Sequence, residues 1–308
     1  MKRKKRNIAL IIAILLMLAL IALMSLRIYH RGRVLNTARV MAAAAEEAEE
    51  TWPGVKEAVA ADIDEMIASH VYSHRGSDGD EEHSFKAYDA AIEAGSRYIE
   101  QDVVISADGI LYVSHDLNAW SMTGRNRLYG NMNSEAIDQL RTRAGNKVLR
   151  LSEVFDRYGR NINYVVELKS DSDACVEAFA KLVDEYGLGD LITVQSMYPW
   201  RLEELETRYP DMPKLFICRS QAEFGRALDS PYIDIISVKA DAGLMTLSNC
   251  EEAHGHNKLF SAWILNSEEA IKTAIDFGVD TYFTGDTPLA LSIEREYGIN
   301  EGRRRGKR

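Results

Sequence analysis

Cysteine is scarce in this sequence of 308 residues. The three cysteines, Cys175, Cys218 and Cys250, are widely spaced and form no CxxC pair. An odd number without close pairs supports neither a disulfide framework nor a zinc cluster. We therefore expect all three to be buried as small hydrophobic residues.

Positive charge is also scarce once the two ends of the chain are set aside. Five of the first six residues and five of the last six are Lys or Arg, so 27 of the 37 basic residues face all 47 acidic ones. The body between the ends therefore carries a net charge of about −20. Such an acidic body argues against a nucleic-acid groove on the folded domain.

One long apolar run follows the basic N-terminus. It extends from Ile8 to Leu26, and a helix of that length spans about 28 Å, close to the roughly 30 Å hydrocarbon thickness of a bilayer. A cleaved signal peptide is the alternative, but it needs a shorter apolar region followed closely by small residues. The first such patch, Ala42 to Ala45, lies well beyond the run, so we expect an uncleaved transmembrane anchor.

The charges that flank this run bear on its orientation. The cluster from Lys2 to Arg6 favours a cytoplasmic N-terminus, whereas Arg27, Arg31, Arg33 and Arg39 form a competing cluster on the other side. We expect a single-pass protein of the cell membrane with its folded domain outside the cytoplasm.

Composition divides the chain into four parts. Residues 1–27 form the basic leader and anchor, and residues 28–67, rich in Ala and Glu, are predicted to form a helical stalk or linker. Residues 68–296 are predicted to form one folded domain. The basic tail, 297–308, is predicted to be disordered and is a candidate for contact with anionic lipid.

Apolar, β-branched runs alternate with amphipathic stretches through the folded domain. Helical patterns follow most of the runs, as at Ser84–Ala94, Asp171–Tyr186 and Ser267–Phe277. The predicted strands are Ala68–Ser73, Tyr98–Ile105, Tyr164–Leu168, Ile192–Gln195, Lys214–Cys218, Ile233–Val238, Leu259–Trp263 and Thr281–Thr284.

This alternation predicts an α/β fold with a parallel sheet, and eight strands fit a (β/α)8 barrel. A ninth short run, Leu111–Ser114, follows the Asp108-Gly109 turn closely, which predicts a small hairpin insertion after the second strand. An open doubly wound sheet is the alternative, but no GxGxxG motif follows any strand to support its nucleotide-binding form.

Ionisable residues gather at the ends of three neighbouring predicted strands, where a barrel places its active site. They are His74 and Arg75, Glu100 and Asp102, His115 and Asp116, and Glu167 and Lys169. Because strand residues alternate between faces, Glu100 and Asp102 share a side and should meet Glu167. Oxygen ligands of this kind favour one divalent cation, Mg2+ or Ca2+.

The ordered motifs resemble the glycerophosphodiester phosphodiesterase family over residues 68–295. The resemblance rests on short motifs in the family's order: HRG at 74–76, ExD at 100–102, DG at 108–109, HD at 115–116, ExK at 167–169, LSEV at 151–154, the fourth-strand ending at 193–196, the Trp-to-Asn segment at 263–266, GVD at 278–280 and TGDTP at 284–288. Members of that family are TIM barrels.

The resemblance implies a metal-dependent hydrolase of lipid metabolism that cleaves glycerophosphodiesters to glycerol 3-phosphate and an alcohol. It implies that the substrate's glycerol hydroxyl attacks first and that water then opens a cyclic phosphate. The matched positions are Glu100, Asp102 and Glu167 as metal ligands, His74 and His115 as the acid/base pair, and Arg75 and Lys169 as phosphate contacts.

Several positions depart from the family pattern and put substrate recognition in question. Glu82-His83-Ser84 replaces the family's ENT, residues 120–123 replace the usual Arg-Thr, and Leu149-Arg150 replaces the Pro before LxEV. We expect Glu82 to contribute to substrate choice and Trp263 to line the pocket, although a core position for Trp263 fits the sequence as well.

Two other functions stay open from the sequence. One is a phospholipase D-like phosphodiesterase acting on lysophospholipids at the membrane, and the other is a catalytically inactive, membrane-tethered barrel. The remaining histidines carry no predicted role: we expect His70 to pack and His254-Gly255-His256 to form a loop.

Overall fold

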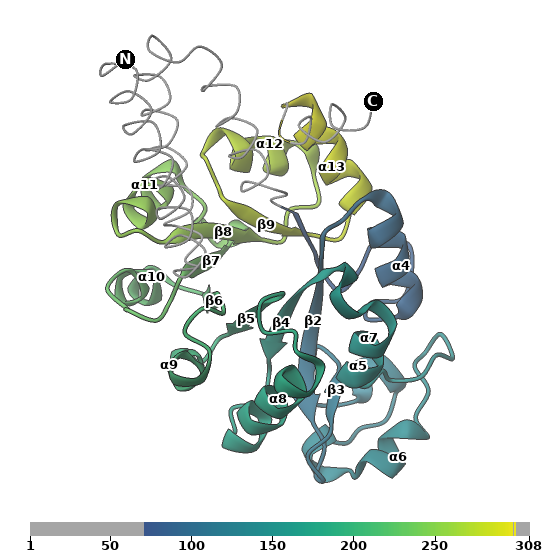
Figure 1. Ribbon diagram of the computed structural model, residues 1–308. Helices are drawn as coiled ribbons and strands as arrows, with labels where there is room; N and C mark the ends of the chain where they lie inside the picture. The colour runs from purple at the N-terminus through teal and green to yellow at the C-terminus, as the bar shows by residue number, and fades with distance from the viewer. Residues whose placement is uncertain (1–70, 298, 300–308) are drawn as a thin grey trace, which may run out of the picture.

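The computed structural model describes residues 71–297 and 299. Eight parallel strands form a closed ring with helices around it (Figure 1). The ring strands are β1 (Val71–Ser73), β2 (Tyr98–Ile105), β4 (Asn163–Leu168), β5 (Ile192–Ser196), β6 (Lys214–Cys218), β7 (Ile235–Lys239), β8 (Leu259–Trp263) and β9 (Thr281–Thr284). The predicted parallel eight-stranded barrel is thus confirmed.

Helices connect successive strands. The α-helices of the barrel are α4 (Phe85–Ala94), α7 (Leu151–Tyr158), α8 (Asp173–Tyr186), α9 (Pro199–Arg208), α10 (Gln221–Leu228), α11 (Leu247–Gly255), α12 (Glu268–Asp276) and α13 (Thr287–Glu296). Short 3-10 turns, η2 (Gly159–Asn161) and η3 (Ala240–Ala242), follow α7 and β7. Many of these helices begin at a hydroxyl cap; Ser172, for example, accepts the amide hydrogen of Cys175.

Two apolar clusters explain why the strands are hydrophobic on both faces. The larger lies between strands and helices and includes Val166, Val194 and the helix residue Phe179. The smaller fills the barrel and includes Tyr72, Leu215 and Phe283. Most strands thus contribute alternate residues to the two clusters, as a closed parallel barrel requires.

Register brings the polar ends of β2 and β4 together. These strands pair in parallel, and Asp102 lies opposite Glu167. The ring closes between β1 and β2, where Ser73 lies opposite Ile99. The ends of β1, β2 and β4 are therefore neighbours at one rim of the barrel.

A short strand, β3 (Leu111–Val113), pairs antiparallel with β2, with Val113 opposite Val103. Residues 114–150, here called the β3–α7 segment, follow β3 and contain α5 (Trp120–Thr123), η1 (Tyr129–Asn131) and α6 (Ser134–Asp138). The segment has its own apolar cluster, which includes Tyr129 and Ile137 and packs on β2 and β3. Figure 1 shows α5 and α6 beside β3 at the edge of the barrel.

Several sequence predictions fall outside the described residues: the apolar run Ile8–Leu26, the stalk at 28–67 and most of the basic tail. Within the described part of the chain, no helix combines the length and hydropathy needed to cross a bilayer. The loop prediction for residues 254–256 was wrong, because His254 and Gly255 complete α11 and His256 caps it. All three cysteines are buried and free, as predicted.

Candidate functional site

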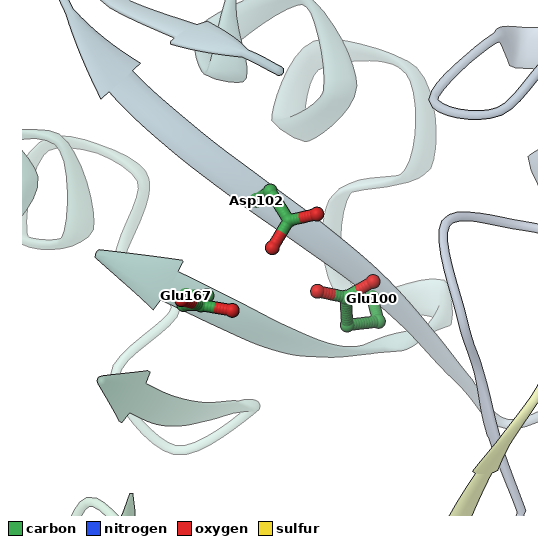
Figure 2. Close-up of side chains that lie close together, drawn as sticks. All are labelled: Glu100, Asp102 and Glu167. Atoms are coloured by element: carbon green, nitrogen blue, oxygen red, sulfur yellow. The ribbon is translucent and has the colours of Figure 1, made fainter. Parts of the chain in front are cut away.

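Three buried carboxylates meet at the rim formed by β2 and β4. Glu100, Asp102 and Glu167 each offer an oxygen, and these atoms all lie within 4.8 Å of one another. Figure 2 shows Glu100 and Asp102 on one strand turning their carboxyl groups toward Glu167 on the next. The alternation and register of β2 and β4 produce this convergence.

Two cationic side chains lie against the carboxylates. Arg75 Nε is 3.2 Å from Asp102 Oδ2, and the backbone amide of Arg75 donates to Glu100 Oε2 at 2.9 Å. Lys169 Nζ is 3.2 Å from Asp102 Oδ1 and 2.9 Å from Glu167 Oε2. Both predicted phosphate contacts therefore belong to the same cluster as the predicted metal ligands.

His83 is the site residue whose role the sequence analysis missed. Its Nε2 lies 3.0 Å from Asp102 Oδ2, and its Nδ1 lies 3.0 Å from the buried hydroxyl of Tyr88. Burial lowers the pKa of His83, so the neutral ring donates from Nε2 to Asp102 and accepts from Tyr88. The only signal in the sequence was the departure at positions 82–84 from the related motif.

The other two residues of that motif, Glu82 and Ser84, do not contact the carboxylates. Ser84 Oγ accepts the Ala87 amide hydrogen and begins α4. Glu82 is exposed, and its Oε2 accepts from Arg75 Nη1 at 2.8 Å. Glu82 thus reaches the cluster only through Arg75.

The surroundings shift the pKa values of the three carboxyl groups in different directions. Burial and the neighbouring charge of Asp102 raise the pKa of Glu167 to about 8 and raise that of Glu100 well above its usual range. Burial acts the same way on Asp102, but the hydrogen bond from His83 and the charge of Lys169 outweigh it and hold the pKa of Asp102 well below its usual range. Asp102 therefore stays ionised in this cluster.

His74 follows β1 and is packed edge-on against Phe283, with ring centroids 6.5 Å apart. Burial lowers its pKa to about 3, and the charge of Arg75 adds to the effect. The imidazole of His74 is therefore neutral near pH 7. His74 directly follows β1 and His115 follows Ser114, which is hydrogen-bonded to β2, so both histidines lie where β1 and β2 meet.

His115 stands at the more open side of the site. Its side chain is 44% exposed, and Nδ1 lies 2.9 Å from Asp116 Oδ1. The preceding residue, Ser114, donates its amide hydrogen to the carbonyl of Asp102. The backbone of β2 thereby fixes His115 close to the carboxylate cluster.

Trp263 ends β8 and lies next to Lys239, whose Nζ is 6.0 Å from the centre of the indole ring. Its Nε1 is buried without a hydrogen-bond partner among the described residues. Trp263 packs against the apolar cluster inside the barrel, so the core position and the pocket-lining position are compatible.

The donor set fits a hard divalent cation. Two oxygens bound to one such ion at about 2.0–2.6 Å lie no more than about 5 Å apart, which matches the spacing of the three carboxylates. Glu167 Oε1 is buried and has no hydrogen-bond partner among the described residues. A buried, unpaired carboxylate oxygen beside two further carboxylates is the arrangement that a cation relieves.

A parallel (β/α)8 barrel with acidic and basic side chains converging at one strand rim defines the class of TIM-barrel enzymes. Residues 74–288 match the model of the glycerophosphoryl diester phosphodiesterase family. The chain belongs to this family, which confirms the resemblance predicted from its motifs and makes it an enzyme of the glycerophosphodiester phosphodiesterase type.

Curated relatives carry the name of this family, and solved structures share the fold. A glycerophosphodiester phosphodiesterase of Bacillus subtilis is 23% identical over 253 residues, covering 73% of this chain and 86% of the relative. A phosphodiesterase of Oleispira antarctica, solved in complex with the product sn-glycerol-3-phosphate, has a TM-score of 0.66 at 18% identity and covers 75% of this chain and 99% of its own. A putative member from Agrobacterium tumefaciens has a TM-score of 0.68 at 19% identity, with 75% and 99% covered.

Proposed function

We propose that this enzyme hydrolyses glycerophosphodiesters to glycerol 3-phosphate and an alcohol, using a divalent cation and two histidines. One observation carries the proposal: Glu100, Asp102 and Glu167 converge in a buried cluster that also holds Arg75 and Lys169. Cleaving a phosphodiester requires positive charge at the phosphoryl oxygens. It also requires proton transfer at two further oxygens, that of the attacking hydroxyl and that of the leaving alkoxide.

The three carboxylates would hold the cation, Mg2+ or Ca2+. When bound, such an ion supplies positive charge that polarises a phosphoryl oxygen. Arg75 and Lys169 add fixed positive charge on either side of Asp102. The guanidinium fork of Arg75 suits two phosphate oxygens, whereas the ammonium of Lys169 acts as a point charge.

His74 and His115 would move the protons. The neutral ring of His74 can accept the proton of the attacking hydroxyl. His115, whose Nδ1 is engaged by Asp116, has Nε2 left to donate a proton to the leaving alkoxide. If the first product is a cyclic phosphate, the two rings exchange roles when water opens it.

Glu82 and Trp263 would act in substrate recognition. Glu82 is exposed and orients Arg75, so it lies where a head group would pass. The unpaired indole N–H of Trp263 offers a donor, and its ring offers an apolar wall to a glycerol moiety.

Single substitutions test this proposal. His74→Ala and His115→Ala should each lower kcat at least 100-fold on glycerophosphocholine with Mg2+ or Ca2+ present, because each removes a proton-transfer group. His256→Ala, at the exposed histidine that caps α11, is the matched control and should retain full activity. Unchanged turnover in both site variants, with folding intact by circular dichroism, would show that these histidines are not the acid/base pair.

Lysophospholipids are the second candidate substrate. The human lysophospholipase D GDPD3 is 23% identical over 158 residues, and the chain spans about half of that relative's length, 49%. Exposed apolar side chains beside the site, such as Trp120 at 57%, favour access to a lipid. Comparing kcat/KM for lysophosphatidylcholine and glycerophosphocholine decides between the two substrate classes. If neither is turned over, the alternative of a catalytically inactive barrel is favoured.

The membrane anchor also stands as a proposal, supported by the length of the Ile8–Leu26 run and its basic flank. Resistance of the full chain to alkaline carbonate extraction from membranes would support it. Protease added outside intact cells should then degrade the folded domain, and full protection there would contradict the expected orientation.

A further inference from the structure

The β3–α7 segment differs in charge from the rest of the described barrel. Residues 114–150 hold six Lys and Arg against three Asp and Glu, a net charge of +3, whereas the rest of residues 71–297 holds 16 against 35, a net charge of −19. A basic surface on an acidic domain is not explained by solubility, which the acidic charge already provides. It suggests an anionic partner for this surface.

Most of the segment's positive charge is not neutralised within the fold. Arg125, Arg127, Arg141 and Arg143 are exposed, and among the described residues none of them forms an ion pair with a carboxylate. Where these arginines do bond, the acceptors are carbonyls: Arg143 donates to Ser121 and Trp120, and Arg141 donates to Asp138 and Leu140. Some exposed arginines elsewhere on the domain, such as Arg160 with Asp190, are paired. The four guanidinium charges are therefore available to a partner.

Large apolar side chains are exposed among these arginines. Leu117 is 45% exposed, Trp120 is 57% exposed and Leu128 is 46% exposed. They belong to one local structure, because Asn118 bridges to Leu128 and the Tyr129 amide donates to the Leu117 carbonyl. The Arg143 guanidinium lies 5.5 Å from the centre of the Trp120 ring. Tryptophan and leucine interleaved with arginine are typical of surfaces that lie in a membrane interface.

The segment also borders the functional site on two sides. It begins at Ser114 and His115, directly beside the Asp102 backbone. Farther along, Thr142 Oγ1 and Asn146 Nδ2 each donate to Glu81 Oε2 at 2.7 Å, in the loop that carries Glu82. Whatever binds the segment therefore lies close to the entrance of the site.

We propose that the β3–α7 segment docks the domain on an anionic lipid surface, with Leu117, Trp120 and Leu128 in the headgroup region and the four arginines against lipid phosphates. A lipid surface fits better than a nucleic acid for two reasons. A bilayer takes up exposed Trp and Leu, which a polyphosphate backbone does not. A bilayer also meets this one face of the domain, whereas a long polyanion would meet the acidic remainder.

Hydrogen exchange on the full chain tests this docking without requiring catalysis. Vesicles of phosphatidylcholine with 30% phosphatidylglycerol should slow amide exchange in residues 115–130, and vesicles of phosphatidylcholine alone should not. The double variant Arg125→Gln/Arg127→Gln should lose this protection and bind the anionic vesicles roughly tenfold more weakly, given the attraction of each basic residue to such a surface. Raising the salt concentration should weaken binding in the same way.

A matched control removes two exposed charges elsewhere. Arg226 and Arg295 are exposed on other faces and form no ion pair within the described part of the chain, so Arg226→Gln/Arg295→Gln should keep the protection of residues 115–130. The comparison cancels any binding through the chain ends, which all variants share. Equal exchange with and without anionic vesicles, or protection by single-stranded DNA in place of vesicles, would overturn the proposal.

Discussion

Asp102 is the carboxylate of the site that its neighbours hold most firmly. Arg75 and His83 contact one of its oxygens and Lys169 contacts the other. His83 achieves this from a backbone conformation with φ of 57°, which costs a residue other than Gly or Asn some free energy. The related motif carries Asn at this position, which adopts this φ more readily. The longer histidine side chain contacts both Asp102 and Tyr88, at the cost of a strained backbone.

Removing the His83 ring should weaken cation binding. Support of this kind around metal ligands is worth about 10- to 100-fold in affinity, so His83→Ala should raise the Kd for Ca2+ or Mg2+ by about tenfold or more. Isothermal titration calorimetry on the metal-free protein measures this directly. It separates a positioning role from a general loss of activity.

His83→Asn is the informative companion variant. It suits the positive φ and keeps a donor, so it should recover much of the affinity that His83→Ala loses. An unchanged Kd in His83→Ala, with an unchanged melting temperature, would contradict the positioning role.

Sequence patterns could locate the carboxylates but not His83. Glu100, Asp102 and Glu167 lie on strands, where alternation and parallel pairing fix the direction of each side chain. His83 lies in a loop, and its contact with Asp102 depends on a local backbone conformation that a single sequence does not specify. For the same reason, the sequence could not show which of residues 82–84 belongs to the carboxylate cluster.

At the scale of elements, the loop between β1 and α4 depends on close packing at Gly76. Its φ is 102°, and a Cβ there would lie 2.5 Å from Ala87 Cβ and 2.7 Å from the Ala87 carbonyl carbon. Gly76→Ala therefore requires both a strained backbone and a displaced α4. We expect a loss of about 3 kcal/mol or more in the free energy of unfolding by urea denaturation.

Gly79 provides the matched control in the same loop. Its φ is 99°, but a Cβ there would meet nothing within 4 Å. Gly79→Ala should therefore lower the free energy of unfolding by only about 1 kcal/mol, the cost of placing alanine at a positive φ. Equal losses for the two variants would show that the contact with α4 is not what position 76 requires.

An ion pair ties the end of α11 to the start of β9. His254 Nε2 lies 2.7 Å from Asp280 Oδ2, and this contact is the main cause that raises the pKa of His254 to about 10. Because the pKa of His254 is higher in the folded state, protonated His254 stabilises the fold. This contribution is complete at a pH below the unfolded pKa near 6.5 and is lost as the pH rises through about 10.

His254→Ala should therefore lower the free energy of unfolding by about 2 kcal/mol at pH 6. The difference from the unmodified protein should shrink as the pH approaches 10, which denaturation at several pH values would reveal. His256→Ala is the control, because its contact with Asp229 is long, at 3.5 Å, and exposed. A pH-independent difference for His254→Ala would contradict the ion pair's role.

The strands were predictable because each apolar run is buried on both faces. The end of α11 was not predictable, because a glycine such as Gly255 indicates that a helix has already ended. The helix is stabilised there by the contact of His254 with Asp280, which lies 26 residues away in the sequence. Helix ends that depend on such distant contacts are beyond local patterns.

At the scale of the whole molecule, cation binding should stabilise the barrel. The ligands come from β2 and β4, and in the metal-free protein burial and crowding raise the pKa of Glu100 and Glu167. At a concentration 100 times the Kd, Ca2+ or Mg2+ should add about 2.7 kcal/mol, which corresponds to a melting temperature about 5–10 °C higher. Differential scanning calorimetry with and without a chelator measures the shift.

Glu167→Gln should abolish most of this shift while leaving the fold intact, because the amide keeps the size of the side chain and removes one anionic ligand. Glu177→Gln, an exposed residue on α8, serves as the control and should retain the shift. A cation-induced shift of equal size in Glu167→Gln would contradict the three-carboxylate site.

The overall architecture followed from the order of the elements, because eight alternating strands and helices have few other compact arrangements. The distribution of charge over the folded surface did not follow from it. The net charge of the body conceals the basic β3–α7 segment, in which the fold places Arg143 against Trp120 of α5.

The β3–α7 segment packs its small apolar cluster on β2 and β3 and is also hydrogen-bonded to Glu81 of the β1–α4 loop. Its exposed residues can vary while β2 keeps Glu100 and Asp102 in register with β4. Apart from His115 at its start, the segment meets the surroundings, whereas β2 and β4 hold the carboxylates. Changing residues 117–140 should thus alter what the domain contacts while the carboxylates of β2 and β4 stay in place.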